Sequence, residues 1–235
     1  MAWDYIIQGF SEAVKLIDDP YVIEIAIRSI KVSGIATLMA VAWSLPISVL
    51  LGLKDFPGKW LVKTLINGLM GVPTVIWGLV LYLMFVPLGP LGSLGLLYTE
   101  MGISVGQALL ITPIIMSIVV NSLESIEGEI RELALTLGAD EIRASFQVVR
   151  ESIGGIVLAI IAAFNRAISE LGIALMIGGN IYVRGGVYNT RVLTTAIQMY
   201  TVRAEISIAI ALGIILMGIV LAVNLLSNLV RKWLE

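Results

Sequence analysis

Cysteine and histidine are both missing from this 235-residue sequence. Without cysteine the chain forms no disulfide and offers no thiolate to a metal or a substrate, and without histidine it lacks the usual proton-transfer group at neutral pH. A hydrolase working inside a membrane would then need a serine–lysine or carboxylate arrangement, and no apolar segment holds a lysine deep enough for that role. The composition therefore predicts no catalytic residues and no metal or cofactor in this chain.

Charge is also scarce. Charged residues make up only 14 % of the sequence against 58 % hydrophobic residues, the mean hydropathy is +0.98, and residues 64–99 form a run of 36 without one charge. Such values are typical of proteins that cross a membrane several times. The net charge of −2, without a basic cluster, argues against a nucleic-acid partner. The sequence predicts a multi-pass protein of the cell (plasma or inner) membrane, in contact with the lipid bilayer.

Five segments are candidates for crossing the bilayer. Four lie in uncharged runs of about 20 residues or more, the length that a helix needs to cross ~30 Å of hydrocarbon; they are residues 32–53, 64–85, 101–123 and 206–230. The fifth, residues 152–177, contains Arg166 and Glu170, an i,i+4 pair of opposite charge that partly neutralises itself. We therefore expect an all-α integral membrane protein with about five transmembrane helices and with its termini on opposite sides.

Residues 1–20 differ from the rest because apolar side chains such as Ile6, Phe10 and Ala13 recur at helical spacing beside polar ones. This pattern predicts an amphipathic helix that lies in the membrane interface, ahead of a transmembrane domain over residues 21–235. Acidic residues are spread through this segment, and it lacks a basic start followed by an apolar stretch. We expect no cleavable signal peptide.

The longest charged segment between spans, residues 124–151, predicts two short helices joined by a glycine turn. Acidic residues open the first helix over 127–137, Gly138 follows it, and Asp140 is placed to cap the second. Ile142, Phe146 and Val149 would give the second helix one apolar face. Such a rigid hairpin below a bundle has the shape of a docking surface for a cytoplasmic protein.

This segment resembles the EAA loop of ATP-binding cassette (ABC) importer permeases. Glu132-Leu133-Ala134, three residues, Gly138, nine residues and Val148 follow that family's spacing, although Leu133 replaces an alanine and Arg150-Glu151 replace Leu-Pro. The resemblance implies a type I ABC importer permease fold and a cytoplasmic coupling loop over residues 124–151, docked on an ATPase. The coupling residues would be Glu132, Ala134, Leu137, Gly138, Ala139, Asp140 and Phe146.

The chain itself lacks a phosphate-binding loop, because Gly52 and Gly58-Lys59-Trp60 have the wrong spacing and no serine or threonine follows the lysine. ATP and Mg²⁺ are therefore expected on the partner ATPase.

The side of the membrane follows from the same loop. Basic residues number eight in the segments expected inside and six in those outside, a weak bias under the positive-inside rule. The cytoplasmic coupling loop decides the orientation. We expect the N-terminus outside and the C-terminus in the cytoplasm.

Further stretches resemble permeases of the tungstate and molybdate group. They are Gly71-Val72-Pro73, the ALTLGA stretch of residues 134–139, Arg166-Ala167 with Glu170 and Gly172, Gly178-Gly179-Asn180, and residues 190–197. The resemblance implies import of an oxyanion, with tungstate favoured and molybdate or sulfate as alternatives. It also implies a homodimer, because five spans are too few to enclose a pathway, together with two ATPase subunits and an extracellular or periplasmic binding protein.

Two sets of residues are candidates for contacts along the pathway. The first set, which would line or gate it, is Pro73, Arg166, Glu170, Gly172 and Asn180; Arg166 and Glu170 would alternatively form only an intrahelical pair that holds the bundle together. The second set, Arg184, Arg191 and Arg203, is expected on the outer face, where it would steer an anion, contact the binding protein, or merely anchor span ends to headgroups.

Two other classes of function compete with a permease. A secondary transporter would show inverted repeats and titratable pairs in both halves, and no such repeat is present in the sequence. A structural subunit without transport activity stays open at this point.

Overall fold

The computed structural model describes residues 2–186 and 188–234, and within this part of the chain all regular structure is helical. The helices are α1 (Ala2–Leu16), α2 (Pro20–Leu53), α3 (Lys59–Met70), α4 (Thr74–Phe85), η1 (Gly92–Leu94), α5 (Glu100–Glu124), α6 (Glu127–Thr136), α7 (Glu141–Glu151), α8 (Ile153–Ile168), α9 (Gly172–Gly178), α10 (Leu193–Val202) and α11 (Ile206–Leu234).

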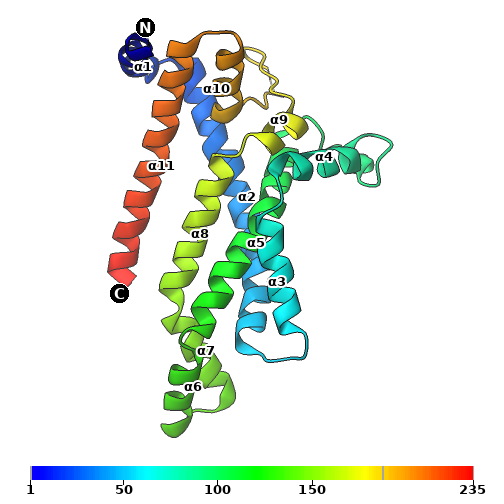
Figure 1. Cartoon of the computed structure of the whole chain (residues 1–235), viewed down its shortest axis with the longest axis vertical. Helices are drawn as coiled ribbons and strands as arrows, with labels where there is room; N and C mark the ends of the chain where they lie inside the picture. Colours follow the sequence, from blue (N-terminus) through cyan, green and yellow to red (C-terminus); the bar gives the residue numbers. More distant parts are fainter. Residues whose placement is uncertain (1, 187, 235) are drawn as a thin grey trace.

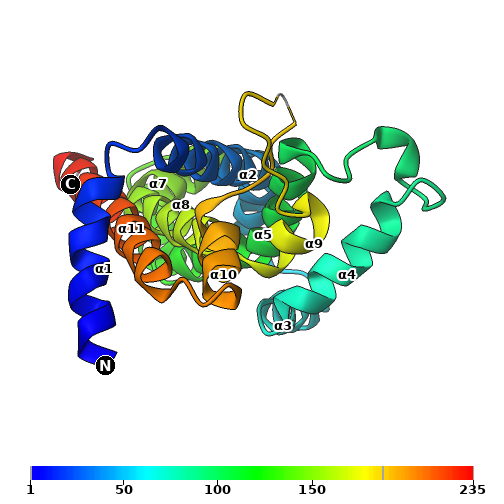
Figure 2. The same ribbon diagram turned by 90° about the horizontal axis from the view of Figure 1, so that it is seen from above.

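The molecule is an elongated bundle whose two ends differ (Figure 1). The α6–α7 hairpin extends from one end, which we call the hairpin end, and α1 and α10 lie at the other, which we call the α1 end. Figure 2, a view from the α1 end, shows α1 and α11 on one side of the bundle and α4 projecting from the opposite side.

Local sequence signals set where the long helices begin. The Asp19 carboxylate accepts hydrogen bonds from the backbone N–H groups of Tyr21 (2.8 Å) and Val22 (3.3 Å), and Pro20 occupies the first turn of α2. The Thr99 hydroxyl accepts a hydrogen bond from the Gly102 N–H at 2.9 Å at the start of α5. These caps set where α2 and α5 begin at the α1 end.

The core of the bundle is formed where α2, α5 and α8 pack together. Alanines supply the buried faces of α2 and α8, and isoleucines that of α5; these residues are Ala36, Ala40, Ile111, Ile115, Ala159, Ala163 and Ala167, all fully buried. Small side chains let helix backbones approach closely, and in lipid such packing is a main source of helix association. Close packing of small side chains on α2 and α8 against the isoleucines of α5 therefore stabilises the core.

Within the part of the chain that the structure describes, three helices are long and apolar enough to cross a membrane, namely α2, α5 and α11, and the bent pairs α3–α4 and α7–α8 bring the total to as many as five. The contacts at the two ends support five passes. Lys59 and Lys63 of α3 pair with Glu124 at the hairpin end, and after α4 the chain reaches Glu100, which pairs with Arg28 at the α1 end. The expected all-α membrane fold is confirmed.

The second predicted span is wrong in one respect: residues 64–85 are not one helix. The chain breaks after Met70, and α3 and α4 meet at a bend of 95°. Gly71 ends α3, and Pro73 stands immediately before α4, where a proline lacks the N–H that would continue the preceding helix. Hydropathy does not predict such a bend, because α3 and α4 are both apolar.

The fourth predicted span also differs. Residues 152–177 contain two helices, because α8 ends at Ile168 and α9 begins at Gly172. The segment between α9 and the last span contains α10, which packs on α11 beside the start of α2. A turn at Arg203 and Ala204, the latter at φ +60°, then leads into α11.

Candidate functional site: the α6–α7 hairpin and the broken helices

The turn of the hairpin is closed by the glycine that the sequence predicts. Gly138 has φ +90°, a conformation that other residues rarely adopt. Its N–H donates to the Leu135 carbonyl at 3.0 Å, and the Ala139 N–H donates to the Ala134 carbonyl at 3.0 Å, a pattern known as the Schellman motif. The Asp140 carboxylate then accepts a hydrogen bond from the Arg143 N–H at 2.8 Å and caps α7.

A charged contact holds the two helices of the hairpin at a fixed angle. The Arg131 guanidinium of α6 donates two hydrogen bonds to Glu141 of α7, at 2.8 and 3.1 Å, and lies 3.4 Å from Glu127. These hydrogen bonds to Glu141 raise the pKa of Arg131. The turn and this contact together make the hairpin rigid.

The apolar side chains of α7 divide into two sets. Ala144 and Val148 are fully buried and anchor α7 to the bundle, whereas Ile142 and Phe146 are 82 % and 70 % exposed. Ile142, Phe146 and Val149 share one side of α7, as their spacing predicts, but only Val149 packs against the core while the other two are exposed. With Leu137, which is 79 % exposed, Ile142 and Phe146 form an unpartnered apolar tip.

A groove of about 530 Å³ runs between α6 and α7. Its walls carry apolar residues from α6 and polar residues from α7: Ile130, Leu133, Ala134, Leu137, Ala139, Arg143, Gln147 and Glu151. The structure thus brings the expected coupling residues together on one hairpin, and Glu132 is exposed on the surface of α6. A groove with an apolar floor and a charged rim is suited to binding a protein.

An ion cluster at the base of the hairpin was not predicted. Glu124, the last residue of α5, pairs with Lys63 at 2.5 Å and with Lys59 at 3.1 Å, and Lys59 also pairs with Asp55. The lysine side chains are 31 % and 15 % exposed, so the cluster is partly shielded from water. This clasp ties α3, the first half of the broken second span, to the helix that leads into the hairpin.

The break between α8 and α9 is built around a buried carboxylate. Glu170 is 2 % exposed; its Oε2 accepts a hydrogen bond from Arg166 at 2.6 Å, and its Oε1 accepts hydrogen bonds from the N–H groups of Gly172 (2.9 Å) and Ile173 (3.3 Å). The expected Arg166–Glu170 pair is therefore present. Glu170 has a second role that the sequence did not indicate, because it also caps α9.

The two broken spans touch at their breaks. A Cβ atom on Gly172 would lie 3.1 Å from the Thr74 hydroxyl oxygen, at the residue that follows Pro73. Pro73, Arg166, Glu170 and Gly172 thus belong to one region, at the contact between α4 and α9, and Figure 1 shows these two helices next to each other. Asn180 lies apart from them, in the segment after α9 at φ +52°. Their function in gating stays a prediction.

We expect Glu170→Ala to lower the free energy of unfolding by about 2–4 kcal/mol, because α9 loses its cap and Arg166 its partner. For a chain of this size the midpoint of thermal denaturation in detergent falls by roughly 5–15 °C. Glu170→Gln replaces the carboxylate with an amide whose oxygen still accepts a hydrogen bond. This variant is expected to lose less than half as much free energy of unfolding. Equal midpoints for all three proteins would contradict the capping role; loss of transport in a stable Glu170→Gln protein would support a gate.

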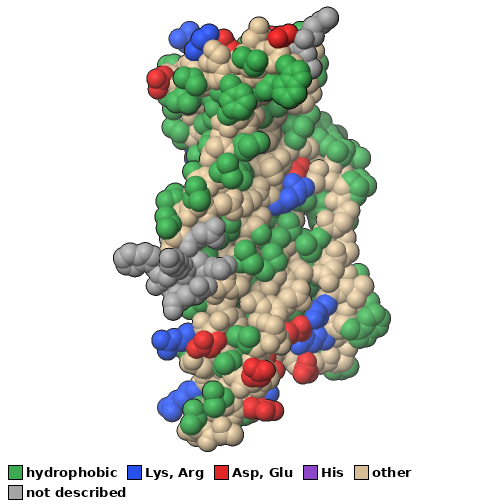
Figure 3. All heavy atoms as spheres, turned by 60° about the vertical axis from the view of Figure 1, so that its left-hand side comes forward, with side chains coloured by type: hydrophobic (Ala, Val, Ile, Leu, Met, Phe, Trp, Pro, Cys, Tyr) green, Lys and Arg blue, Asp and Glu red, His purple; other side chains and the backbone are tan. Residues whose placement is uncertain are grey.

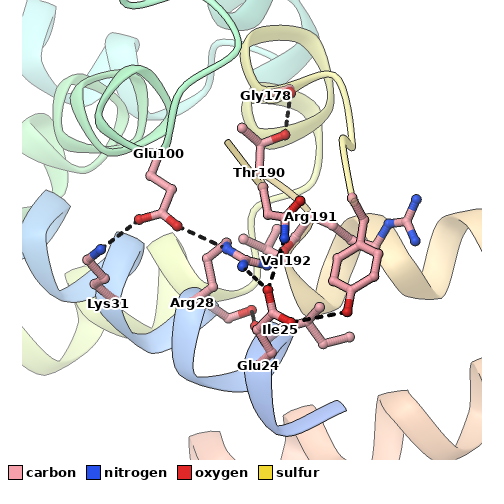
Figure 4. A network of polar contacts seen from close by, with 12 residues as sticks. Glu24, Ile25, Arg28, Lys31, Glu100, Gly178, Thr190, Arg191 and Val192 are labelled. Atoms are coloured by element: carbon pink, nitrogen blue, oxygen red, sulfur yellow. Dashed lines mark hydrogen bonds and ion pairs between the residues drawn. The ribbon is translucent and has the colours of Figure 1, made fainter. Parts of the chain in front are cut away.

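At the α1 end a network of charges joins three elements (Figure 4). Arg28 of α2, whose side chain is 8 % exposed, donates hydrogen bonds to Glu24 (2.5 Å), to Glu100 of α5 (3.0 Å) and to the Arg191 carbonyl (3.1 Å). Lys31 pairs with the other oxygen of Glu100 at 2.8 Å. Only the Glu24–Arg28 pair follows from sequence spacing, because the partners from α5 and from the segment after α9 are distant along the chain.

The three arginines expected on the outer face have different surroundings. Arg184 and Arg203 are exposed. Arg191 instead contacts other parts of the fold. Its guanidinium donates hydrogen bonds to the side chain and carbonyl of Asn180 and to the Tyr21 hydroxyl. It also lies 5.4 Å from the centre of the Tyr182 ring. Burial and a hydrogen bond to Glu24 raise the pKa of Tyr182. Arg191 thus acts first as a structural residue.

Comparison with known proteins agrees with this geometry. Residues 44–235 match the sequence model of the family described as "binding-protein-dependent transport system inner membrane component". The chain is 39 % identical over 206 residues to a probable anion ABC transporter permease protein of Haloferax volcanii, covering 88 % of this chain and 89 % of that protein. It is 36 % identical over 223 residues to a tungstate uptake system permease protein of Peptoclostridium acidaminophilum, covering 94 % and 96 %.

The fold resembles a chain of the inward-facing MetNI methionine ABC transporter, with a TM-score of 0.69 over 91 % of this chain and 96 % of that one, at 15 % identity. This likeness confirms the expected type I importer permease fold. The family match extends from within α2 through the whole hairpin to the last residue, so it covers most of the chain and assigns its family. The chain belongs to the family of binding-protein-dependent transport system inner membrane components.

Proposed function

We propose that this chain is the membrane-spanning subunit of an ATP-driven importer that takes up an oxyanion, with tungstate as the favoured substrate. It provides the translocation pathway and no ATPase site. ATP and Mg²⁺ bind a separate ATPase subunit, two of which dock on the dimer, and a binding protein outside the membrane delivers the anion. Molybdate and sulfate are the alternative substrates.

The observation that carries this proposal is the α6–α7 hairpin. It is rigid, it is buried on one side through Ala144 and Val148, and it presents an apolar tip and a groove on the other. A rigid element of this kind transmits the movement of a partner, whereas a flexible loop would absorb it. The hairpin therefore supports a role as the contact through which ATP-driven closure of the ATPases moves the spans.

Tungstate is favoured because a relative that matches nearly the whole chain carries that name and another is named as an anion permease. No permanent deep anion site is needed, since an importer must release what it carries. Selection among oxyanions is expected mainly in the binding protein, where a closed cleft of hydrogen-bond donors surrounds the anion.

The number of spans and the exposed surface of α3 and α4 support a homodimer as the proposed assembly. These two helices leave a broad apolar face uncovered, formed by Trp60, Leu61, Leu65, Val75, Ile76, Leu79 and Leu83. A second copy on this face would place the breaks at residues 71–73 and 169–171 next to the dimer axis. In this arrangement the hairpin end and the C-terminus face the cytoplasm, and the α1 end faces outward.

Uptake by proteoliposomes tests the proposal. With the chain, its ATPase and its binding protein present, we expect tungstate to accumulate only when ATP is supplied on the side of the ATPase, as measured by mass spectrometry of the washed vesicles. An excess of molybdate should compete more strongly than sulfate. Accumulation without ATP would favour a secondary transporter, and ATP-dependent uptake of sulfate alone would overturn the substrate.

A further inference from the structure

The helix α1 crosses α11 instead of running beside it. Figure 1 shows α1 end-on and α11 from the side, and Figure 2 shows α1 lengthwise. The contact uses small residues, because Gly9 and Ala13 are buried against α11, where Gly9 packs on Ile210. The Ser207 hydroxyl donates a hydrogen bond to the Gln8 side chain at 3.1 Å. α1 is therefore fixed to the fold through one narrow face.

A second face of α1 is apolar and uncovered. Its large side chains recur at intervals of three and four residues, so they lie along one side of the helix. They are Trp3 (75 % exposed), Ile7 (68 %), Phe10 (59 %) and Val14 (72 %), and Ile17 (57 %) continues the stripe just after the helix ends. In water, a contiguous apolar stripe of this length would be unfavourable. Lipid or another protein surface must therefore cover this stripe.

The polar residues of α1 lie on the other side of the helix. Asp4, Gln8, Ser11, Glu12 and Lys15 occupy the arc away from the apolar stripe, and Lys15 pairs with Glu12 at 2.9 Å. Figure 3 shows charged groups at the upper rim of the molecule and hydrophobic side chains just below them. The helix is thus divided into a water-compatible side and a side suited to hydrocarbon.

The position of α1 favours lipid over a second copy of the chain as the covering material. The apolar side of α11 also carries exposed residues at helical spacing, Met217 (63 %), Leu221 (57 %) and Leu225 (66 %), and a membrane-spanning helix exposes such residues to lipid. α1 lies on the opposite side of the bundle from α4, the helix of the expected dimer face (Figure 2). A dimer formed there leaves α1 at the periphery.

We propose that the apolar stripe of α1 is a lipid-binding surface, immersed at the boundary between headgroups and acyl chains of the leaflet at the α1 end. Amphipathic helices in this position insert their apolar side about 5–10 Å into that boundary. Because α1 is fixed to the first turns of α11, this surface sets the depth of the last span. The inference concerns lipid contact only, so it is independent of which anion the protein carries.

Single spin labels test the proposal cleanly, because the natural chain has no cysteine to remove. In reconstituted full-length protein, Ile7→Cys, Phe10→Cys and Val14→Cys labels are expected to be relaxed more by oxygen, which concentrates in lipid, than by a water-soluble nickel chelate. Gln8→Cys and Ser11→Cys should show the reverse preference. Leu221→Cys on α11 provides the lipid reference and Leu133→Cys on the hairpin the aqueous one.

Two results would overturn the proposal. Equal access of the nickel chelate to both sets of labels would mean that the stripe is in water. Low access of both reagents to the apolar set, with spin–spin coupling between copies at Ile7→Cys, would mean that a second copy covers it. Both readings are obtained without a transport assay, so they are distinguishable from failure of the proposed transport function.

Discussion

Replacing Gly138 with valine is expected to reduce ATP-driven transport by roughly 5- to 30-fold while the membrane bundle stays folded. Gly138 has φ +90°, and a residue with a Cβ atom pays about 1–2 kcal/mol in the left-handed region, with more for a β-branched side chain. No neighbouring atom obstructs a Cβ at this position, so the effect arises from backbone conformation alone. The hairpin would then adopt its closed turn in only a fraction of the molecules.

The apparent affinity for the ATPase is expected to fall by the same factor, because a partner binds only the competent fraction. Titration of the ATPase onto the purified chain in detergent measures it. Gly138→Asn provides the first control, since asparagine tolerates this conformation and should keep most of the affinity. Gly128→Ala provides the second: Gly128 lies in α6 of the same hairpin with open space around it, and its replacement should have little effect. Equal affinities for the Val and Asn variants would contradict the role assigned to the turn.

The second large effect is expected at the clasp formed by Glu124, Lys59 and Lys63. Glu124→Lys puts three cations together where two ion pairs stood, at a cost of about 1–3 kcal/mol, because the side chains are partly buried. α3 would separate from the base of the hairpin. We expect ATP hydrolysis by the complex to continue while transport per ATP hydrolysed falls severalfold, since the hairpin would move without moving the broken span.

A charge exchange distinguishes this linkage from simple instability. In Lys63→Glu with Glu124→Lys one ion pair is rebuilt in reverse, and the ratio of transport to hydrolysis should recover in part. Lys54→Glu is the matched control for the Lys63→Glu half of the exchange: it makes the same change of charge in the neighbouring turn, at an exposed residue with no ion pair among the described residues. If the exchange variant is as uncoupled as Glu124→Lys alone, the clasp is not the connection between hairpin and span.

The features that the sequence predicts correctly are those set by local chemistry. The glycine turn at Gly138 and the cap at Asp140 depend on residues within one or two helical turns, and both have the expected geometry. The number of passes follows from apolar length, which needs no knowledge of neighbours. α2 and α5 continue through Pro46 and Pro113, because a proline inside a long packed helix is tolerated when the surrounding helices hold it.

The features that the sequence does not predict depend on the direction of the backbone and on contacts between residues distant along the chain. The break at residues 71–73 lies within an apolar run, and the break at residues 169–171 lies within a segment that is apolar apart from Arg166 and Glu170, so hydropathy gives no direction to the backbone at either. Capping of α9 by Glu170 cannot be predicted without knowing that the chain breaks between α8 and α9. The Glu124 clasp and the Arg28–Glu100 contact join residues more than 60 positions apart. One signal was available: Glu100 and Glu124 bound an uncharged run, and acidic residues there require partners near the membrane surface.

If the α6–α7 hairpin is the surface on which the ATPase acts, an exposed residue of α7 lies within reach of that subunit. A photocrosslinker attached to Phe146→Cys in the assembled transporter, followed by mass spectrometry of the products, tests it most directly. We expect a covalent product with the ATPase subunit, and none from the same crosslinker at Val183→Cys, an exposed residue near the α1 end. Labelling of Phe146→Cys by an impermeant thiol reagent from outside intact cells, with no product on the ATPase, would contradict it.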